Sequence, residues 1–522
     1  MNRPASLRLL SLGVAIGLAW TTACRDVVSE SRHAGDSGPG DPPIFRRDHE
    51  VPPAEDPDAV RRAPSGPTLE GPVAGLGSPW LSGTSFDLDE VDYVAAEYFF
   101  GGVANGYAPV GELTEDGRWQ VEPADTAEYR TRFVLYRPRD AAAFNGSVIV
   151  EWLNVSAGFD SAPDWIMMHT ELVREGWVWV GVSAQEVGVE GHLKRLDAER
   201  YGSLKHPGDT FSYDIFSQVA QVLRGHQAEV DPLEGLIPER ILATGESQSA
   251  FRLVTYVNAI DPVAELYDGF LIHSRGGGAA PLSQDPLPAV EPPGVVLIRE
   301  ETRVPVLVLQ TETDLIHLGS WLSRQPDAQN LRLWEMAGTA HADAYTLQVG
   351  ASDLGDDPGV ADIVITAEPV PGTISCGAPI NAGPQHFVAK AAVAALDEWV
   401  RSGSEPEQAP RLQVQPDGSA FELDEHGNVL GGIRTSYVEA PTAVLSGLGQ
   451  AGFDFCRMLG TTVPFDEAKL AELYPEKSDY ERAVDAATDA AVAKGFLLEV
   501  DGELIKTAAK LSDIGGGGAT EP

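Results

Sequence analysis

The sequence predicts an α/β fold with a mostly parallel central sheet, helices on both faces and antiparallel strands on the N-terminal side. Between residues 147 and 401, short apolar runs alternate with amphipathic helical runs, a pattern typical of a parallel sheet covered by helices. At residues 241–260, an apolar run meets small residues and then a helical run, which indicates a tight strand-to-helix turn.

The N-terminus has the features of an export signal. Two arginines precede an apolar run over residues 9–20 that is too short to span a bilayer comfortably. The small residues before Cys24 resemble a lipobox, in which the cysteine becomes the lipidated first residue, although Thr21 stands where leucine is usual. We therefore expect residues 1–24 to be a signal peptide of the lipoprotein type, with ordinary cleavage nearby as the alternative. The protein would then be exported, as a cell-envelope lipoprotein or a secreted protein.

A disordered tether and one folded body follow this signal. Residues 25–75 are rich in Pro, Gly, Asp, Arg and Ser and contain few large apolar residues, a composition typical of flexible linkers. We expect the folded domain over 76–510 and a loose tail over 511–522. Its first strands should be 91–100 and 127–136, which would be antiparallel, with Gly101-Gly102 and Asn105-Gly106 in their connection.

The alternating part of the chain supplies the parallel sheet. We expect strands at 147–153, 177–183, 240–244, 267–273, 304–310 and 331–336, and helices at 162–175, 211–224, 251–260 and 388–401. Three segments break the alternation: 185–210, 276–303 and 342–387. Each follows the carboxyl end of a strand, where such sheets bind ligands, so they are candidates for a lid and pocket walls or are purely structural insertions. A C-terminal extension over 411–510 should contain a β-hairpin at 412–434 and a helix at 466–494.

Composition excludes some classes of function. The formal net charge of -41 argues against binding to nucleic acid or another polyanion and is typical of a solvated acidic surface. Only Cys24, Cys376 and Cys456 are present, without clustered histidines, which argues against a zinc site. In an exported chain, Cys376 and Cys456 could form one disulfide or remain two unpaired thiols.

The strand-to-helix turn is the candidate site. Gly245-Glu246-Ser247-Gln248-Ser249 fits a G-x-S-x-G nucleophile elbow with Ser249 in place of the last glycine. Small residues two positions before and two positions after the serine allow the strand and helix backbones to approach closely. Ser247 is therefore the candidate nucleophile.

A serine hydroxyl needs a base, and that base needs an orienting carboxylate. His341 follows the strand at 331–336 in a turn of small residues, which is where the base of such an elbow is expected; His386 is the runner-up. Asp314 follows the strand at 304–310 and is the favoured acid, with Glu312 as the alternative.

An oxyanion hole needs two N–H donors. One should come from Gln248, directly after the nucleophile, and the other from Asn154 or Val155, in the loop after the strand at 147–153. Glu246, beside the serine, can form a local hydrogen bond, but its sequence position assigns it no catalytic role.

These motifs resemble those of the α/β-hydrolase superfamily, in particular a large bacterial group known only as "α/β hydrolase domain" proteins. The resemblance rests on these segments together with 144–156, 201–209 and Gly431-Gly432-Ile433-Arg434, and it covers about residues 75–510. It implies an α/β-hydrolase fold with a Ser–His–acid triad, and it implies no particular substrate.

The leading hypothesis is a serine hydrolase that cleaves carboxylic esters of small molecules through an acyl-enzyme. This chemistry requires neither a metal ion nor an organic cofactor. No nucleic acid partner is expected. Contact with a membrane is expected only through the N-terminal lipid. The alternatives are a peptidase or amidase with the same triad, and a catalytically silent envelope lipoprotein that uses the fold for binding. The ester itself and the oligomeric state do not follow from the sequence.

Overall fold

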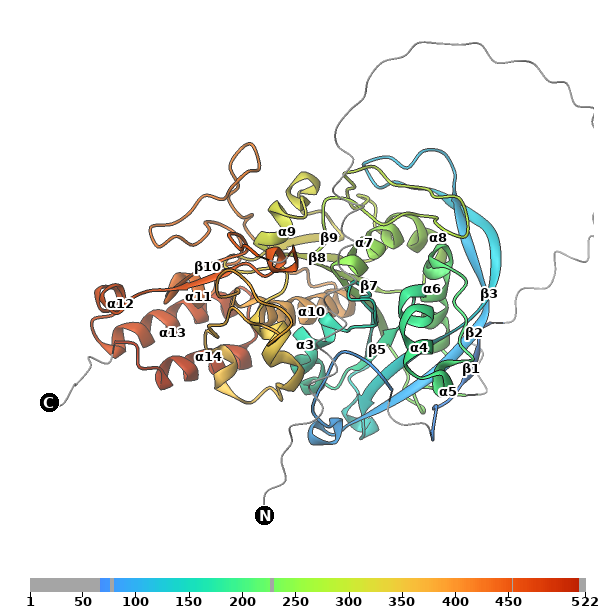
Figure 1. Cartoon of the computed structure of the whole chain (residues 1–522), viewed down its shortest axis with the longest axis horizontal. Coiled ribbons are helices and arrows are strands. Elements are labelled where there is room, and N and C mark those ends of the chain that lie inside the picture. Colours follow the sequence, from blue (N-terminus) through green and yellow to red (C-terminus); the bar gives the residue numbers. More distant parts are fainter. Residues whose placement is uncertain (1–65, 76–78, 226–229, 453, 516–522) are drawn as a thin grey trace, which may run out of the picture.

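The computed structural model describes residues 66–75, 79–225, 230–452 and 454–515 (Figure 1). The predicted signal peptide with Cys24, and residues 25–65 of the predicted tether, lie outside these residues. The last part of the predicted tether is wrong, because residues 68–70 form a strand that pairs with the sheet. No helix in the described part of the chain is long and apolar enough to cross a membrane.

A nine-stranded sheet forms the centre of the fold, in the order β1-β2-β3-β5-β4-β6-β7-β8-β9. The strands are β1 (Thr68–Glu70), β2 (Tyr93–Pro109), β3 (Val121–Pro138), β4 (Ser147–Trp152), β5 (Val178–Val182), β6 (Arg240–Glu246), β7 (Gly269–His273), β8 (Val306–Gln310) and β9 (Leu331–Glu335). The pairs β1-β2, β2-β3 and β3-β5 are antiparallel. The pairs β5-β4, β4-β6, β6-β7, β7-β8 and β8-β9 are parallel. The prediction of a mostly parallel sheet with antiparallel N-terminal strands is confirmed.

Helices cover both faces of this sheet, as predicted. On one face, α6 (Ser212–Leu223) and α7 (Gln248–Thr255) bury their apolar side chains against residues such as Val150, Ala243 and Ile272. On the other, α3 (Pro163–Arg174) and α10 (Gln385–Ser402) pack against the alternate residues of the same strands, such as Ile149, Leu242 and Leu271. Successive strand residues point to opposite faces, so each buried strand contributes side chains to the hydrophobic cores on both faces of the sheet.

The remaining helices are short or belong to the C-terminal extension. They are η2 (Leu88–Val91), η3 (Ala141–Ala143), η4 (Val187–Leu193), α4 (Lys194–Leu196), α5 (Ala198–Tyr201), η5 (Asp209–Phe211), η6 (Tyr256–Ile260), α8 (Asp261–Ala264), α9 (Glu312–Ile316), η7 (Ser320–Ser323), η8 (Tyr345–Val349), η9 (Gly350–Ser352), η10 (Pro358–Ala361), α11 (Ser436–Glu439), η11 (Asp454–Met458), α12 (Glu467–Leu473), α13 (Lys477–Ala493) and α14 (Glu499–Leu511).

The connection predicted between the first two long strands is wrong. Gly101-Gly102 and Asn105-Gly106 lie inside β2, which pairs with β3 along almost its whole length, with a register shift between Asn105 and Tyr107. A Cβ at Gly101 would lie 2.6 Å from the carbonyl oxygen of Tyr129 on β3. The glycine therefore marks a close approach of two backbones within the sheet, where a side chain would clash, and not a turn.

The C-terminal extension packs beside the α3 and α10 face (Figure 1). The helix predicted over 466–494 is two helices, α12 and α13, separated around Pro475; proline has no N–H to continue a helix. The predicted hairpin at 412–434 is represented by isolated bridges, among them Val414 with Phe421 and Leu423 with Val429. A second small sheet pairs β10 (Ala443–Ser446) with β11 (Thr461–Pro464).

A buried charge cluster fixes the 185–210 insertion to the sheet. Arg132 on β3 contacts Glu97 on β2 at 2.6 Å and Asp160, in the loop after β4, at 3.0 Å. Arg200 on α5 donates to the other oxygen of Glu97 at 2.7 Å. All four side chains are buried, and removing one partner of such a pair costs about 3–5 kcal/mol. The segment that holds α5 is therefore anchored to the sheet.

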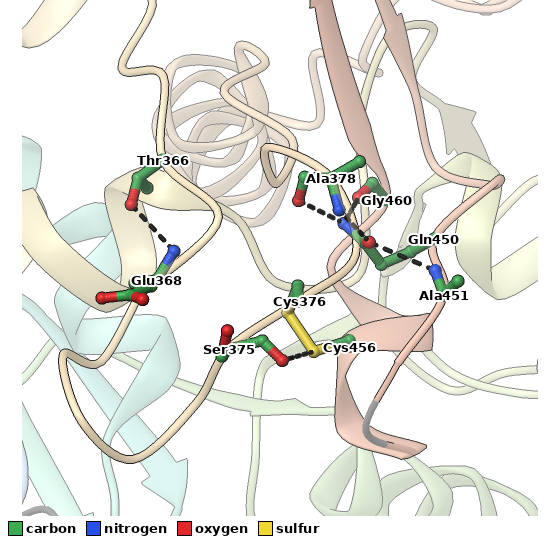
Figure 2. The surroundings of a disulfide bond; sticks show 9 residues. All are labelled: Thr366, Glu368, Ser375, Cys376, Ala378, Gln450, Ala451, Cys456 and Gly460. Atoms are coloured by element: carbon green, nitrogen blue, oxygen red, sulfur yellow. Dashed lines mark hydrogen bonds between the residues drawn. A yellow bond between two sulfur atoms is a disulfide. The ribbon is translucent and has the colours of Figure 1, made fainter.

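A disulfide joins the 342–387 insertion to the C-terminal extension. Cys376 and Cys456 are bonded, and Figure 2 shows how Gln450 reinforces this junction. Its side-chain amide exchanges two hydrogen bonds of 3.0 Å with the backbone of Ala378 and donates to the carbonyl of Gly460 at 2.9 Å. The insertion and the extension are thus tied together covalently and by hydrogen bonds.

Candidate functional site

Ser247 stands at a strained turn between β6 and α7. Its φ of 59° and ψ of -120° lie in a region that non-glycine residues rarely adopt and that is found at functional sites. The turn is held by the Ser247 N–H, which donates to the carbonyl of His273 at 3.0 Å. A Cβ at Gly245 would lie 3.0 Å from the Cβ of Ser249, so the small residues permit the close approach of strand and helix.

The structure brings Ser247, His341 and Asp314 together. The Ser247 Oγ lies 2.8 Å from Nε2 of His341, and Nδ1 of the same ring lies 2.6 Å from Oδ1 of Asp314. His341 and Asp314 are buried, whereas Ser247 is partly exposed. Nδ1 therefore donates to the carboxylate, and Nε2 accepts from the serine hydroxyl.

Two carboxylates control the charge of His341. Burial alone would lower its pKa, but the neighbouring carboxylates of Glu246 and Asp314 outweigh burial and raise the pKa above its ordinary value. The ring therefore takes up a proton more readily than a histidine in water.

Asp314, and not Glu312, reaches the histidine. Asp314 lies in the first turn of α9, where its second carboxylate oxygen accepts from the N–H of Thr311 at 2.7 Å. Glu312 accepts from the N–H groups of Gly338 at 2.6 Å and Gly447 at 2.8 Å. Burial raises the pKa of Glu312 to about 7, although these two N–H groups oppose the shift. Glu312 thus joins the loop that bears His341 to the C-terminal extension.

The loop that bears His341 is held by late parts of the chain. The Ala337 N–H donates to the carbonyl of Ile433 at 3.0 Å, and the Ala342 N–H donates to that of Met458 at 3.2 Å. The Asn381 side chain donates to the carbonyl of Gly338 at 3.1 Å. The position of His341 therefore depends on both the 342–387 insertion and the C-terminal extension.

The candidate oxyanion donors differ in whether their N–H groups already form hydrogen bonds. The N–H of Asn154 donates to the carbonyl of Ser161 at 2.9 Å. Within the described residues, the N–H of Val155 has no hydrogen-bond partner. Gln248 is the first residue of α7, where N–H groups have no acceptor within the helix. Gln248 and Val155 therefore retain the N–H groups that an oxyanion hole would use.

Glu246 contacts His341, which its sequence position did not reveal. Its Oε1 lies 3.2 Å from Nε2 of His341. The Asn154 side-chain amide donates to the Glu246 carbonyl at 3.1 Å and approaches its carboxylate at 3.4 Å. Burial raises the pKa of Glu246 to about 7, although the nearby histidines His341 and His273 oppose the shift.

Two other histidines, His273 and the runner-up base His386, do not contact the Ser247 hydroxyl among the described residues. His273 is fully buried beneath the elbow, where Nδ1 lies 2.7 Å from Oδ1 of Asp164 and Nε2 lies 3.0 Å from the Gln385 side-chain nitrogen. His386, the runner-up base, is buried and stacks on Tyr345 with ring centroids 3.6 Å apart, and no contact joins it to Ser247 among the described residues.

This arrangement provides the parts for nucleophilic chemistry. A hydroxyl bonded to an imidazole, which in turn donates to a carboxylate, can lose its proton to the ring as it attacks an electrophile. In the described part of the chain, no group of three or more His, Cys, Asp or Glu side chains is placed to hold a metal ion.

Comparisons with known proteins place the chain in a family. A model of the "alpha/beta hydrolase domain" family matches residues 64–507, while the curated proteins include no match. Similar solved structures include an α/β serine hydrolase without a lid from Xanthomonas campestris (15% identity, 45% of this chain and 86% of that chain, TM-score 0.26). A glucuronoyl esterase from Teredinibacter turnerae is also similar (13% identity, 46% and 70%, TM-score 0.24). The family match spans most of the sequence and confirms the predicted resemblance: the chain belongs to the α/β hydrolase domain family.

Proposed function

We propose that the protein is a serine hydrolase that cleaves carboxylic esters through an acyl-enzyme intermediate. The observation that carries this proposal is the continuous hydrogen-bond chain from the Ser247 hydroxyl through His341 to Asp314, built on a strained elbow in a chain of the α/β hydrolase domain family. No metal ion or organic cofactor enters the proposed reaction.

Acylation begins with attack by the Ser247 Oγ on the ester carbonyl carbon. The hydroxyl proton passes to Nε2 of His341, and the imidazolium that forms is held by Asp314 at Nδ1. The carbonyl oxygen becomes an oxyanion, for which the N–H groups of Gln248 and Val155 are the available donors. The intermediate then expels the alcohol, which receives the proton from His341, and Ser247 is left acylated.

Deacylation repeats these steps with water as the nucleophile. His341 takes a proton from the water as its oxygen attacks the acyl carbon, and the same N–H groups hold the second oxyanion. When this intermediate collapses, the proton returns to the Ser247 Oγ and the carboxylic acid leaves. Ester cleavage is preferred to amide cleavage on the analogy of the superfamily.

Covalent labelling tests the proposal. We expect an alkyl fluorophosphonate to modify the wild-type protein at Ser247, and Ser247→Ala to abolish both labelling and hydrolysis of p-nitrophenyl esters of graded acyl length. Equal labelling of Ser247→Ala would refute the assignment of the nucleophile. A labelled protein that cleaves anilides but not aryl esters would establish an amidase instead, and a folded protein that shows neither reaction would support a binding role.

We also propose that the protein is exported, with Cys24 as the lipid-bearing residue. The charged and apolar segments of residues 1–20 and the small residues before Cys24 support export, and a disulfide is typical of proteins in oxidising compartments. Metabolic labelling with a palmitate analogue tests this proposal, because we expect Cys24→Ser to remove the label and to release the protein from membranes.

A further inference from the structure

Glu246 places a second carboxylate on the ring of His341. One carboxylate, Asp314, meets Nδ1, as expected for an orienting acid. The other meets Nε2, the nitrogen that also bonds the Ser247 hydroxyl. The Glu246 side chain is about nine-tenths buried, so water screens its charge only weakly. A buried carboxylate at the proton-accepting nitrogen has no part in the reaction described so far.

The surroundings of Glu246 restrict what its carboxylate can do. Glu246 is the last residue of β6 and directly precedes the nucleophile. The Asn154 side-chain amide donates to the backbone carbonyl of Glu246 and approaches its carboxylate. The titratable groups that face it are His341 and His273, which favour its charged form, and Asp164 and Asp314, which oppose it. No arginine or lysine pairs with Glu246 within the described residues, so its nearest opposite charge is the imidazolium of His341.

We propose that Glu246 is a positioning residue that stabilises the protonated form of His341 during acyl transfer. In the resting site, Nε2 accepts from Ser247. After the serine proton moves to Nε2, the new N–H lies within 3.2 Å of a carboxylate oxygen, and the imidazolium stands between two negative charges. The interaction is stronger after proton transfer than before it, so it lowers the barrier. This inference rests on the proposed serine hydrolase function.

The arrangement has a cost at low pH. A carboxylate beside the ring also favours uptake of a proton from solvent, and a protonated His341 cannot act as a base. The acid limb, which is the fall in rate as His341 becomes protonated, should therefore lie at a higher pH than it would without Glu246. Removal of the charge should lower the plateau rate, where Glu246 is ionised, and at the same time move the acid limb to lower pH.

The test measures fluorophosphonate inactivation and p-nitrophenyl acetate hydrolysis from pH 5 to 9 in the full chain. For Glu246→Gln, we expect the acid limb to move down by about one pH unit and the plateau rate to fall about tenfold, because one pKa unit corresponds to a tenfold change in equilibrium. Glu246→Asp keeps the charge, so its acid limb should lie between those of Glu246→Gln and the wild type.

A matched control is Glu335→Gln, at the last residue of β9. Its carboxylate is also buried in the sheet, but it pairs with Arg324 at 2.7 Å and not with the histidine. We expect this variant to leave the acid limb in place. A merely structural role for Glu246 would lower the rate or stability without moving the acid limb.

The outcomes separate this inference from the proposed function. If the wild-type protein is labelled at Ser247 but Glu246→Gln has an unchanged acid limb, the inference is overturned and the proposed function stands. If the wild type shows neither labelling at Ser247 nor hydrolysis, the proposed function itself fails. If Glu246→Gln does not fold, Glu246→Asp decides, because an unchanged acid limb and plateau rate there would also overturn the inference.

Discussion

Two buried histidine–aspartate pairs flank the elbow, and they differ in what each histidine meets at Nε2. In the first, His341 Nδ1 lies 2.6 Å from Asp314; in the second, His273 Nδ1 lies 2.7 Å from Asp164. Each aspartate comes from the first turn of a helix, α9 or α3. In both pairs, burial would lower the pKa of the histidine, and nearby carboxylates raise it above its ordinary value.

The difference lies at Nε2. His341 presents this nitrogen to the Ser247 hydroxyl, which is partly exposed at a strained turn. His273 presents it to the Gln385 side-chain amide in the closed interior, while its own backbone carbonyl accepts from the Ser247 N–H. A histidine–carboxylate pair therefore does not define an active site. We infer that the first pair takes part in chemistry because its histidine bonds the Ser247 hydroxyl. The second pair supports the elbow, because the His273 carbonyl accepts from the Ser247 N–H.

The largest expected effect comes from breaking the first pair at its acid. Asp314→Asn keeps the shape of the side chain but cannot hold the imidazolium, and we expect kcat for p-nitrophenyl esters to fall by about 10⁴, as in known Ser–His–Asp triads. Steady-state kinetics on folded protein measures this loss.

The matched control for Asp314→Asn is Glu312→Gln. The variant retains one acceptor for the N–H groups of Gly338 and Gly447. Hydrogen bonds of this kind contribute about 1–3 kcal/mol, mainly to stability. The loss in kcat should therefore stay within about tenfold. Equal losses in the two variants would contradict the assignment of Asp314 as the acid.

Breaking the second pair should affect stability instead. His273→Leu leaves Asp164 with the Thr244 hydroxyl, which donates at 2.6 Å, but without the histidine. We expect the free energy of unfolding to fall by about 3 kcal/mol, because a buried carboxylate loses its partner. The backbone bond between Ser247 and His273 survives, so the activity of the folded fraction should remain within about tenfold of the wild type.

Chemical denaturation and active-site titration of the same samples measure both quantities for His273→Leu. A variant that is as stable as the wild type but inactive would place His273 in the chemistry and remove the distinction between the two pairs.

Ser247 and both members of the first pair could be predicted because their positions follow from the fold. Ser247, Asp314 and His341 each follow a strand of the parallel sheet, and strand positions are visible as apolar runs. The pairing of His273 with Asp164 joins residues 109 positions apart, and one of them lies inside a helix, so no local pattern could reveal it. The contact of Glu246 with His341 depends in the same way on where a distant loop folds.

The fold could be predicted where apolar residues recur with a regular period along the sequence. It could not be predicted where contacts between distant strands decide the local structure. Strands β4 to β9 follow the apolar runs within one to two residues. The glycines of β2 have the composition of a turn, yet the tertiary pairing with β3 keeps them in the strand. The break at Pro475 follows the known chemistry of proline, but the surrounding helical pattern concealed it.

The smallest expected effect on activity comes from the disulfide, which lies nearer the first pair. Cys456 lies in η11, whose Met458 carbonyl accepts from the Ala342 N–H, next to His341, whereas His273 meets the 342–387 insertion only at Gln385 among the described contacts. Replacing Cys376 and Cys456 by serine should lower the free energy of unfolding by about 2–4 kcal/mol, with only a modest loss of activity at low temperature. Thermal unfolding with and without dithiothreitol measures the loss of stability.

Hydrogen exchange tests whether the effect of the disulfide is local. After reduction, amides of residues 337–344 should exchange faster, because the loop that bears His341 loses a tether, whereas amides of β7 around His273 should keep their protection. The double serine variant provides the control, since dithiothreitol should not change its exchange. Equal acceleration at both histidines would show that the two pairs belong to one cooperative unit, and that the C-terminal extension stabilises the whole domain rather than the site of Ser247.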